Sequence, residues 1–511
     1  MRAERVVVVG AGIGGLVAAL RLAHAGLDVT VLERADAPGG KMRAVAVGAR
    51  AVEAGPSVFT MRWFLEEIFS EAGERLDEHV RLSPARLLAR HAWSGTERLD
   101  LFADIDESAA AIAAFAGARE AEGYRRFCAR AAEVYRTLEG PFIRGERPSP
   151  VDLALRVGPW GMADLWRIQP FATLWGALGD YFRDSRLRQL FGRYATYCGS
   201  SPFEAPATLM LVAHVEQAGV WYVEGGLSRL ARAVADLAEA RGARIRYRTG
   251  AAAILAEGGR VSGVVTDTGE RIAAERVVAN ADVSALAAGL FGREAARAAE
   301  GVPAEERSLS AVTVCLAARP EGFPLAHHNV FFSGDYRAEF EAIRRGRLPA
   351  DPTVYVCAQD RADADAPTGA PERLLLLVNA PARGETPLKA EEIGSCETSM
   401  RARLSACGLA LNPEPGPVTT APSDFAALFP GTGGALYGRA SKGWAATFRR
   451  PGARTSLPGL YLAGGSVHPG PGVPMAAQSG RIAADSLLRD LGRVSTRPSA
   501  PAATRGGTST R

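Results

Sequence analysis

Three glycines near the start of the chain have the spacing of a dinucleotide-binding turn. Gly10, Gly12 and Gly15 directly follow the apolar run that begins at Arg5, and Glu33 closes the next apolar run. Glycine permits a tight turn and lets a pyrophosphate approach the backbone, while an acidic side chain at this distance can accept hydrogen bonds from an adenosine ribose. The order of strand, glycines, helix, strand and acid therefore predicts a site for a dinucleotide cofactor.

A second stretch, close to the C-terminus, has the composition of a ligand-binding loop. The run from Gly459 to Ala477 opens as a short apolar strand, passes through glycines and prolines, and enters a helix that extends to about Leu491. Pro474 suits the first helical position, where its missing N–H costs nothing. The partial positive charge of such a helix end favours a ligand that becomes more negative as it reacts, such as a reduced flavin. An ordinary strand–turn–helix connection is the alternative.

A layered α/β framework is required to bring these two stretches together. After Gly226, a helix carries Leu227, Leu230, Val234 and Leu237 on one stripe. The other expected elements near the nucleotide are a helix over Leu16–Ala25 and strands over Arg5–Val9, Val29–Glu33, Arg244–Arg248, Arg260–Val265 and Arg276–Asp282. The predicted division is a cofactor domain of residues 1–70, 215–295 and 455–491, a substrate domain of residues 71–214 and 296–454, and a disordered tail of residues 492–511.

Charge and cysteine content exclude several classes of function. The 511 residues include 60 basic and 56 acidic ones, and four of the arginines lie in the acid-free tail. The body is therefore neutral, and nucleic acid is not an expected partner. The six cysteines never form a C-x-x-C motif, which argues against a redox disulfide and a zinc site. His327 and His328 are expected to point to opposite faces of a strand without a cysteine or carboxylate to complete a cluster, so no metal is predicted.

The middle of the chain is rich in aromatic residues. Between Val151 and Arg183, Trp160, Trp166 and Trp175 are interspersed with arginines. This pattern is typical of a helix lying in a membrane interface, although lining of a core or pocket is an alternative. No signal peptide is recognised and no apolar run approaches the ~18 residues of a membrane span. The expected location is cytoplasmic, with peripheral attachment to the inner membrane.

Before the aromatic region, Asp106 is expected to cap a long helix that reaches about Glu139.

Several motifs resemble those of known flavoproteins. Arg34 to Lys41 is similar to the second FAD contact of the glutathione-reductase-like superfamily. The whole chain from Val6 to about Leu491 resembles the bacterial phytoene desaturase family of carotenoid-modifying flavoproteins, whose C-terminal signature matches Gly459 to Val473 except at Val467 and Pro471. Within that family, the hydroxyneurosporene (1-hydroxycarotenoid 3,4-) desaturases are the most similar. The stretches that carry this likeness are 55–63, 435–438, 448–454 and 472–476.

The resemblance implies an α/β fold with a discontinuous, glutathione-reductase-like Rossmann FAD domain and an inserted mixed α+β substrate domain. It also implies hydride transfer from a carotenoid to FAD, with His468 as a candidate to relay the proton or, equally, only to shape its loop. Asn280 and Asp282 are expected beside the cofactor. The residues implied to bind FAD are Gly10, Gly12, Gly14, Gly15, Glu33, Arg34, Gly40, Lys41, Met42, Arg43, Gly55, Pro56, Ser57, Ala251, Asn280, Gly464, Gly465, Val473, Pro474 and Met475.

Other functions stay open at this point. No second glycine-rich dinucleotide turn follows a strand, so the electrons must leave for another acceptor, such as oxygen or a quinone. The alternatives are a phytoene desaturase, a non-redox FAD-dependent carotenoid isomerase, an amine or protoporphyrinogen oxidase of the wider superfamily, and a flavin-binding scaffold without turnover.

Overall fold

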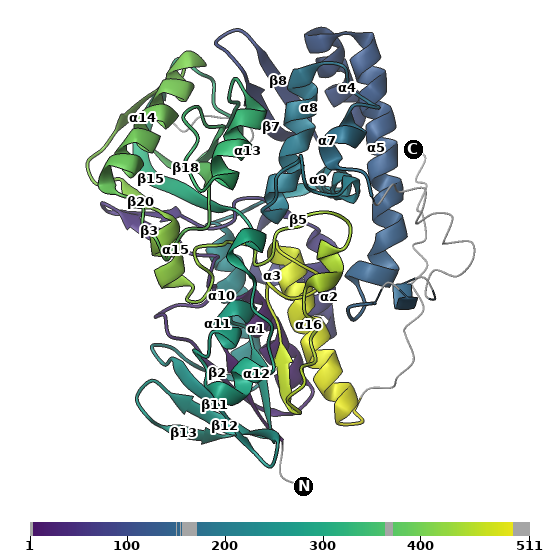
Figure 1. Ribbon diagram of the computed structural model, residues 1–511, viewed down its shortest axis with the longest axis vertical. Helices are drawn as coiled ribbons and strands as arrows, with labels where there is room; N and C mark the ends of the chain where they lie inside the picture. The colour runs from purple at the N-terminus through teal and green to yellow at the C-terminus, as the bar shows by residue number, and fades with distance from the viewer. Residues whose placement is uncertain (1–3, 150, 154, 156–170, 363–370, 494–511) are drawn as a thin grey trace.

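The computed structural model describes residues 4–149, 151–153, 155, 171–362 and 371–493 (Figure 1). Trp160 and Trp166, with the neighbouring Arg156 and Arg167, lie outside the described residues, as does the part of the predicted tail from residue 494 on. In Figure 1 a small antiparallel sheet lies at the bottom, a large sheet at the upper left and a group of helices at the upper right.

A five-stranded parallel sheet gathers three remote parts of the chain. Its strand order is β10, β2, β1, β14, β21. Val7 pairs with Thr30 on one side and with Val277 on the other, while Val278 pairs with Tyr461. The strands are β1 (Arg5–Val9), β2 (Asp28–Leu32), β10 (Arg244–Arg246), β14 (Arg276–Ala279) and β21 (Leu460–Leu462).

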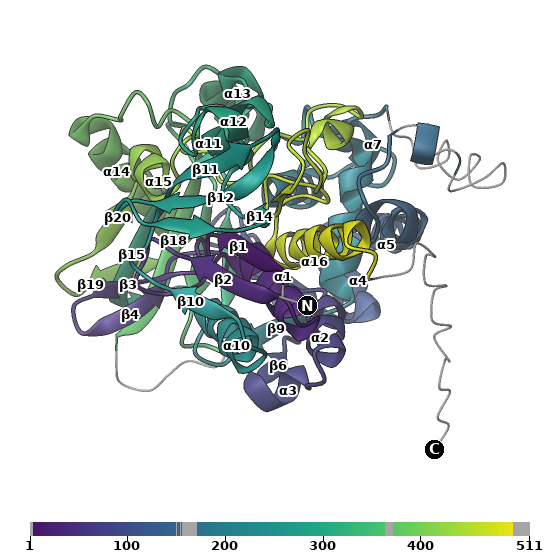
Figure 2. The same cartoon turned by 90° about the horizontal axis from the view of Figure 1, so that it is seen from below.

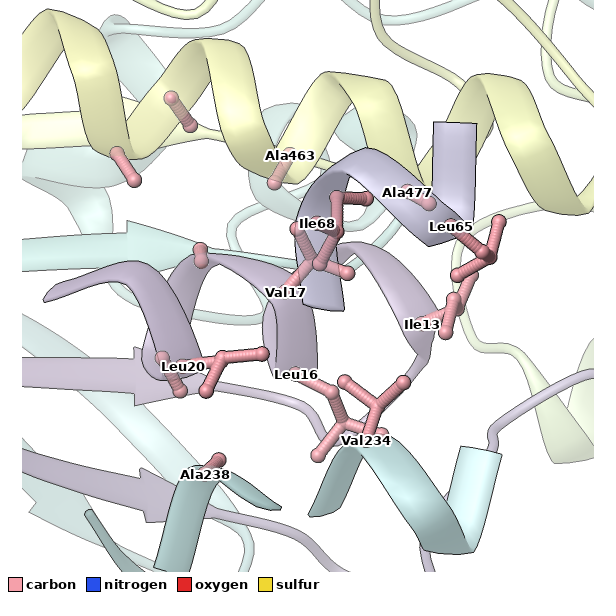
Figure 3. Packing of buried hydrophobic residues seen from close by; sticks show 14 of the residues in the cluster. Ile13, Leu16, Val17, Leu20, Leu65, Ile68, Val234, Ala238, Ala463 and Ala477 are labelled. Carbon is pink, nitrogen blue, oxygen red and sulfur yellow. The ribbon is translucent and has the colours of Figure 1, made fainter. Parts of the chain in front are cut away.

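Both faces of this sheet are covered, as a buried parallel sheet requires. Val6 and Val8 pack under helices, and the alternate Val7 and Val9 pack toward a small antiparallel sheet. Figure 3 shows Leu16 facing Val234 within the helical layer. The covering helices are α1 (Ile13–His24), α2 (Arg62–Glu71), α10 (Leu227–Ala240) and α16 (Val473–Asp490). The opposite layer comprises β11 (Ala251–Glu257), β12 (Arg260–Thr266), β13 (Arg271–Ala273), α11 (Val283–Ala287) and α12 (Arg293–Arg297).

Helices α1 and α16 touch backbone to backbone. A Cβ atom on Gly480 would lie 1.9 Å from the carbonyl oxygen of Gly14, and one on Gly14 would lie 2.8 Å from the carbonyl oxygen of Ala476. Contacts this short leave room only for glycine. Figure 2 shows α16 lying alongside α1 and β1, although these elements come from opposite ends of the chain.

The second large body is an eight-stranded, mostly antiparallel sheet. Its main path is β19, β15, β18, β17, β16, β7, β8, and β20 pairs with β15. Helix α14 (Ala390–Ala406) packs on one face, where Met400 and Leu404 are buried. The strands are β7 (Leu87–Ala92), β8 (Arg98–Phe102), β15 (Ser310–Glu321), β16 (His328–Phe331), β17 (Val354–Ala358), β18 (Glu372–Ala380), β19 (Ala410–Pro413) and β20 (Val418–Thr420).

A group of helices covers the other face of this sheet. The long helix expected to begin after Asp106 is wrong in two respects. Asp104 is the cap, accepting a hydrogen bond from the backbone N–H of Glu107 at 2.8 Å, and Gly117, with φ +99°, ends the first helix. The helices are α4 (Ile105–Ala116), α5 (Ala118–Leu138), α7 (Leu174–Leu178), α8 (Ser185–Gly192) and α9 (Leu211–Gln217).

Smaller elements connect the two bodies. Strands β3 and β4 form a ribbon, and β5, β9 and β6 form a three-stranded sheet. The bounds are β3 (Ala44–Val47), β4 (Arg50–Glu53), β5 (Phe59–Thr60), β6 (Leu82–Pro84), β9 (Val220–Val223), α3 (Leu76–His79), α13 (Tyr336–Arg344) and α15 (Pro422–Leu428).

Several predicted boundaries differ from the structure. Helix α1 begins three residues early because Gly12 is extended and serves as its N-cap. Strand β10 is shorter than predicted because Arg248 adopts φ +53°. The strand at β14 stops before Asp282, whose side chain instead caps α11. In the part of the chain that the structure describes, no helix has the length and apolarity needed to cross a membrane.

The contact between α1 and α16 predicts a large effect for a single methyl group. Gly480→Ala forces the helices apart, and overpacking of this kind typically costs about 1–3 kcal/mol of the free energy of unfolding. We expect a lower Tm and less bound flavin after purification. Gly394→Ala in α14 is the matched control, because a Cβ there meets nothing within 4 Å. An unchanged Tm and flavin content in Gly480→Ala would contradict the proposed role of this contact.

Candidate functional site

A cavity of about 1870 Å³ lies between the parallel sheet and the eight-stranded sheet. One part is lined by the turn after β1, the end of β2 and the start of α16. The other is lined by strands β15, β17 and β18 and by the helical group. The cavity therefore joins the predicted cofactor residues to the body that the sequence assigned to a substrate.

The turn between β1 and α1 contacts Asn280 closely. Gly10 has φ +96°, and Asn280 donates a hydrogen bond from its side-chain amide to the Gly10 carbonyl oxygen at 3.3 Å. A Cβ on Gly12 would lie 2.8 Å from Nδ2 of Asn280. Gly10, Gly12 and Gly14 line the cavity, whereas Gly15 packs against the Gly10 carbonyl, where a Cβ would lie at 2.1 Å. Gly15 thus sets the approach of helix to strand rather than facing a ligand.

Glu33 ends β2 with its carboxylate held in place by the backbone. Its Oε2 accepts a hydrogen bond from the N–H of Ala11 at 2.7 Å, and its Oε1 accepts one from Ala35 at 2.8 Å. The side chain is buried but lines the cavity. Each oxygen keeps a second acceptor position for the ribose hydroxyls of a nucleotide.

The segment after β2 supplies basic side chains to the cavity wall. Lys41 donates a hydrogen bond to the carbonyl oxygen of Leu436, and burial lowers the pKa of its ammonium group. Burial likewise lowers the pKa of Arg43. A Cβ on Gly55 would lie 2.0 Å from the carbonyl oxygen of Lys41, so the segment beginning at Gly55 runs tightly against this turn. Arg34, Gly40, Met42, Pro56, Ser57 and Ala251 also line the cavity.

The C-terminal signature forms the facing wall. Gly464, with φ +111°, and Gly465 line the cavity at the end of β21, and Gly464 donates a hydrogen bond to Oγ of Ser479 at 3.1 Å. Helix α16 begins at Val473, so Pro474 occupies its second position rather than the predicted first. Val473, Pro474 and Met475 line the cavity, and the backbone N–H groups of Val473 and Met475 lie in the first turn of α16, where the helix offers them no acceptor.

Arg450 holds this wall in place and was missed from the sequence. Its guanidinium donates hydrogen bonds to the carbonyl oxygens of Tyr437 at 3.0 Å, Gly465 at 3.1 Å and Arg439 at 2.6 Å. The side chain is buried, and burial lowers its pKa to about 10. A basic residue before a glycine-rich signature carries no pattern that would reveal such a clamp.

These residues fit a dinucleotide that carries a flavin. The glycine turn leaves space where any side chain would collide, Glu33 offers two oriented oxygens, and the first turn of α16 supplies N–H donors opposite the Gly55 segment. The acceptor oxygens of Glu33 suit a ribose, and the glycine turn suits a pyrophosphate. The N–H donors of α16 suit a ring that gains negative charge on reduction.

His468 is placed differently from the prediction of a proton relay. It lies behind the cavity wall, with 2% of its surface exposed. Its Nε2 is 3.1 Å from the carbonyl oxygen of Gly145, and its ring packs edge-on against Phe142 at 4.8 Å. The structure therefore favours the alternative role, in which His468 shapes its loop.

The expectation about the histidine pair is also corrected. His327 lies just before β16, so the strand does not force its ring to the opposite face from His328. Cys357 stands opposite His328 in the antiparallel register, and the three residues offer ligand atoms within 4.8 Å of one another. Their rings are engaged by other groups: Nδ1 of His328 lies 2.7 Å from the Tyr355 hydroxyl, and Nδ1 of His327 lies 2.5 Å from the carbonyl oxygen of Arg361.

Aromatic residues at the end of the predicted interfacial segment divide between core and surface. Phe182 is fully buried, and Trp175 packs against Phe203 at 4.7 Å. Phe182 belongs to the core, as the alternative interpretation held, and the half-buried Trp175 packs against the small cluster of Tyr336, Phe340 and Ile343. Phe171, by contrast, is 61% exposed and contacts the exposed Trp444 at 5.5 Å between ring centroids.

A buried polar group in the cavity wall was missed from the sequence. It consists of Arg193 at the end of α8, Tyr197, Glu216 on α9 and Tyr355 on β17. The one available signal was Glu216, an acidic residue on the apolar side of a helix whose neighbours Ala213 and Val215 are also buried.

The chain matches the model of the flavin containing amine oxidoreductase family over residues 13–488. It is 54% identical to a hydroxyneurosporene desaturase of Rubrivivax gelatinosus, over 100% of this chain and 98% of that protein. It is 47% identical to a hydroxyneurosporene desaturase of Cereibacter sphaeroides, over 95% and 98% of the two chains. A solved structure of putrescine oxidase superposes with a TM-score of 0.58 at 16% identity, covering 96% of this chain and 100% of that one.

These matches confirm three of the predictions. They confirm the resemblance to the carotenoid-modifying flavoproteins, the α/β fold with a Rossmann-type FAD domain, and FAD as the cofactor. The individual cofactor-binding residues stay predictions that the geometry above supports.

Affinity for FAD is expected to depend on Glu33. In Glu33→Gln one acceptor oxygen becomes an NH₂ group that faces the N–H of Ala11 or Ala35, and the charge is lost. Charge-assisted hydrogen bonds contribute about 1.5–3 kcal/mol, so the Kd for FAD should rise by roughly tenfold to a hundredfold. Titration of apoprotein followed by flavin fluorescence measures this change.

The control for this prediction is Glu257→Gln, at the exposed end of β11. An FAD affinity that falls equally in both variants, or in neither, would show that the ribose is held by another group.

Proposed function

Because the chain belongs to the flavin containing amine oxidoreductase family, we propose that it is an FAD-dependent desaturase acting on a carotenoid. The substrate is a 1-hydroxycarotenoid of the hydroxyneurosporene type, and the new double bond forms at C3–C4. The observation that carries this proposal is the full-length identity of 54% and 47% to two hydroxyneurosporene desaturases.

The far part of the cavity suits a long hydrocarbon. Its walls carry many apolar side chains from helices and from the eight-stranded sheet, and they continue without a break to the predicted FAD residues. Each CH₂ moved from water into such a cavity contributes about 0.8 kcal/mol to the free energy of binding. The affinity for a polyene therefore increases with the length of the chain that is buried. The apolar lining includes Val58, Met61, Leu138, Phe142, Leu209, Leu211, Val212, Leu375 and Leu377.

The protein's contribution to the reaction is positioning and the exclusion of water. Desaturation removes a hydride and a proton from neighbouring carbons, and FAD, when bound, supplies the acceptor for the hydride. Met475 at the start of α16 and Ser57 in the Gly55 segment line the cavity where the two parts meet. The apolar walls hold the polyene against this junction and keep water from it. The remaining proton is strongly acidic, so a weak base or water suffices to take it.

Electrons are proposed to pass on to oxygen or a quinone. A further glycine-rich stretch, Gly431 to Gly434, follows α15 rather than a strand and has no room for a nucleotide at Gly431. A Cβ on Gly431 would lie 2.5 Å from Cα of Ala285, so its backbone packs directly against α11. This packing supports an acceptor other than a second bound dinucleotide.

Anaerobic mixing with a 1-hydroxycarotenoid in detergent is expected to bleach the flavin absorbance, one equivalent for each bond formed. The product spectrum should shift to the red as the conjugated system lengthens. Bleaching by phytoene and not by the hydroxylated substrate would indicate a phytoene desaturase. An isomerised product without bleaching would indicate the non-redox isomerase. If no carotenoid is converted and none bleaches the flavin, the protein would be a flavin-binding scaffold.

We also propose that the protein lies on the surface of the inner membrane. Phe171 and Trp444 are exposed and in contact, and Trp444 contacts Phe448, which in turn contacts Phe142 in the cavity wall at 6.0 Å. The exposed rings of Phe171 and Trp444 suit the membrane interface. The line of aromatic contacts from them to Phe142 supports a route by which an insoluble substrate reaches the cavity from the bilayer.

The double variant Phe171→Ser/Trp444→Ser is expected to lose most of its sedimentation with vesicles of phosphatidylglycerol and phosphatidylethanolamine, while its turnover in detergent is kept. Ile105→Ser is the matched control, because Ile105 is an exposed apolar residue at the start of α4. A third protein lacks residues 494–511. Loss of sedimentation only in that deletion would assign attachment to the basic tail and contradict the aromatic contact.

A further inference from the structure

Four polar side chains lie together in the wall of the substrate part of the cavity, among apolar residues and uncharged polar ones such as Thr313 and Asn379. We propose that Arg193, Tyr197, Glu216 and Tyr355, named here the polar cluster, bind the terminal hydroxyl group of the substrate and select hydroxylated carotenoids. This inference rests on the proposed function and adds to it the residues that recognise one end of the substrate.

Arg193 is a partly buried cation in the cavity wall, and Glu216 is the carboxylate whose charge acts on it. Its Nη1 donates a hydrogen bond to the hydroxyl of Tyr197 at 3.0 Å, and its guanidinium lies 5.0 Å and 5.4 Å from the ring centroids of Tyr197 and Tyr355. Among the residues that the structure describes, no carboxylate forms an ion pair with it. A buried guanidinium has five N–H donors, and those that the protein leaves open are available to a ligand in the cavity.

Glu216 provides the complementary acceptor. It is 7% exposed, and its Oε2 accepts a hydrogen bond from the Tyr194 hydroxyl at 2.7 Å. Burial raises the pKa of the Glu216 carboxyl, while hydrogen bonding with Tyr194 and Tyr197 and the charge of Arg193 oppose that rise. Glu216 lines the same cavity as Arg193, so the wall presents donors and an acceptor side by side.

The charges of the cluster favour a neutral polar ligand. A carboxylate would be attracted to Arg193 but repelled by Glu216, and a plain hydrocarbon would leave the remaining N–H donors of Arg193 and the remaining acceptor positions of Glu216 unpaired. An alcohol satisfies both, because its oxygen accepts from Arg193 while its O–H donates to Glu216. A site that hydrogen-bonds a hydroxyl group rejects analogues that lack it, since the buried polar groups are then left unpaired.

The position of the cluster matches the position of the reaction. The Tyr355 hydroxyl forms a 2.7 Å hydrogen bond with Oγ of Ser57, which is one of the residues predicted to bind FAD. In a 1-hydroxycarotenoid, only C2 separates the carbon that bears the hydroxyl from C3. A hydroxyl held at the polar cluster therefore places C3 and C4 close to the junction of the two parts of the cavity.

Equilibrium binding of three pigments by the FAD-loaded protein tests the inference. The pigments are a 1-hydroxycarotenoid, its 1-methoxy derivative and the parent hydrocarbon, each titrated in detergent and followed by quenching of tryptophan fluorescence. The wild type should bind the hydroxylated pigment about tenfold or more tightly than the other two. Arg193→Leu and Glu216→Gln should each reduce this preference to about twofold or less by weakening the binding of the hydroxylated pigment.

Arg183→Leu is the matched control, because Arg183 is exposed just before α8, and it should keep the preference. Equal binding of the three pigments by the wild type would overturn the inference without the need for any variant. A preference that survives in both cluster variants would overturn it as well. If the preference is present and is lost in these variants, but no carotenoid is desaturated, the inference stands and the proposed function fails.

Discussion

The architecture depends on the backbone contact between α1 and α16. Gly14 and Gly480 let two helices from opposite ends of the chain approach so closely that their first turns open onto the same cavity. The Asn280 amide bonds the turn after β1 and would collide with a side chain on Gly464, so the end of β14 belongs to the same junction. Any widening here would separate the two N-termini that the cofactor must span. The parallel sheet holds this junction in register, because β14 lies between β1 and β21, the strands that lead into α1 and α16.

Buried cations are a second common feature of the site. Lys41, Arg43 and Arg450 line the cavity, and burial lowers the pKa of each. Burying such groups costs free energy unless carbonyl oxygens or an anion compensate. Arg450 is compensated by three backbone carbonyl groups. The resulting positive potential suits a ligand that carries a pyrophosphate and gains charge on reduction, so the same groups that fasten the loops also prepare the site electrostatically.

The sequence allowed more to be predicted about the cofactor side than about the substrate side. Gly10, Gly12 and Glu33 lie within one short, local unit whose spacing reflects its geometry, and such units are recognisable in isolation. Arg193, Glu216 and Tyr355 come from three separate elements, and only the packing of α8, α9 and β17 brings them together. For His468 a local motif was misleading. Its place in a glycine-rich signature suggested exposure to the ligand, but its ring packs against Phe142 behind the cavity wall. The pairing of His328 with Cys357 likewise depends on a strand register that no local pattern reveals.

The order in which the parallel sheet is completed bears on biosynthesis. β1 and α1 leave the ribosome long before β21 and α16, because most of the described elements lie between them in the sequence. Until then the edge of β14 lacks its last partner and the glycine face of α1 lies bare, a state in which unpaired strands and apolar surface invite aggregation. The site therefore closes only after α16 has been made, and a chain that ends shortly before residue 473 would lack the cavity wall that α16 forms.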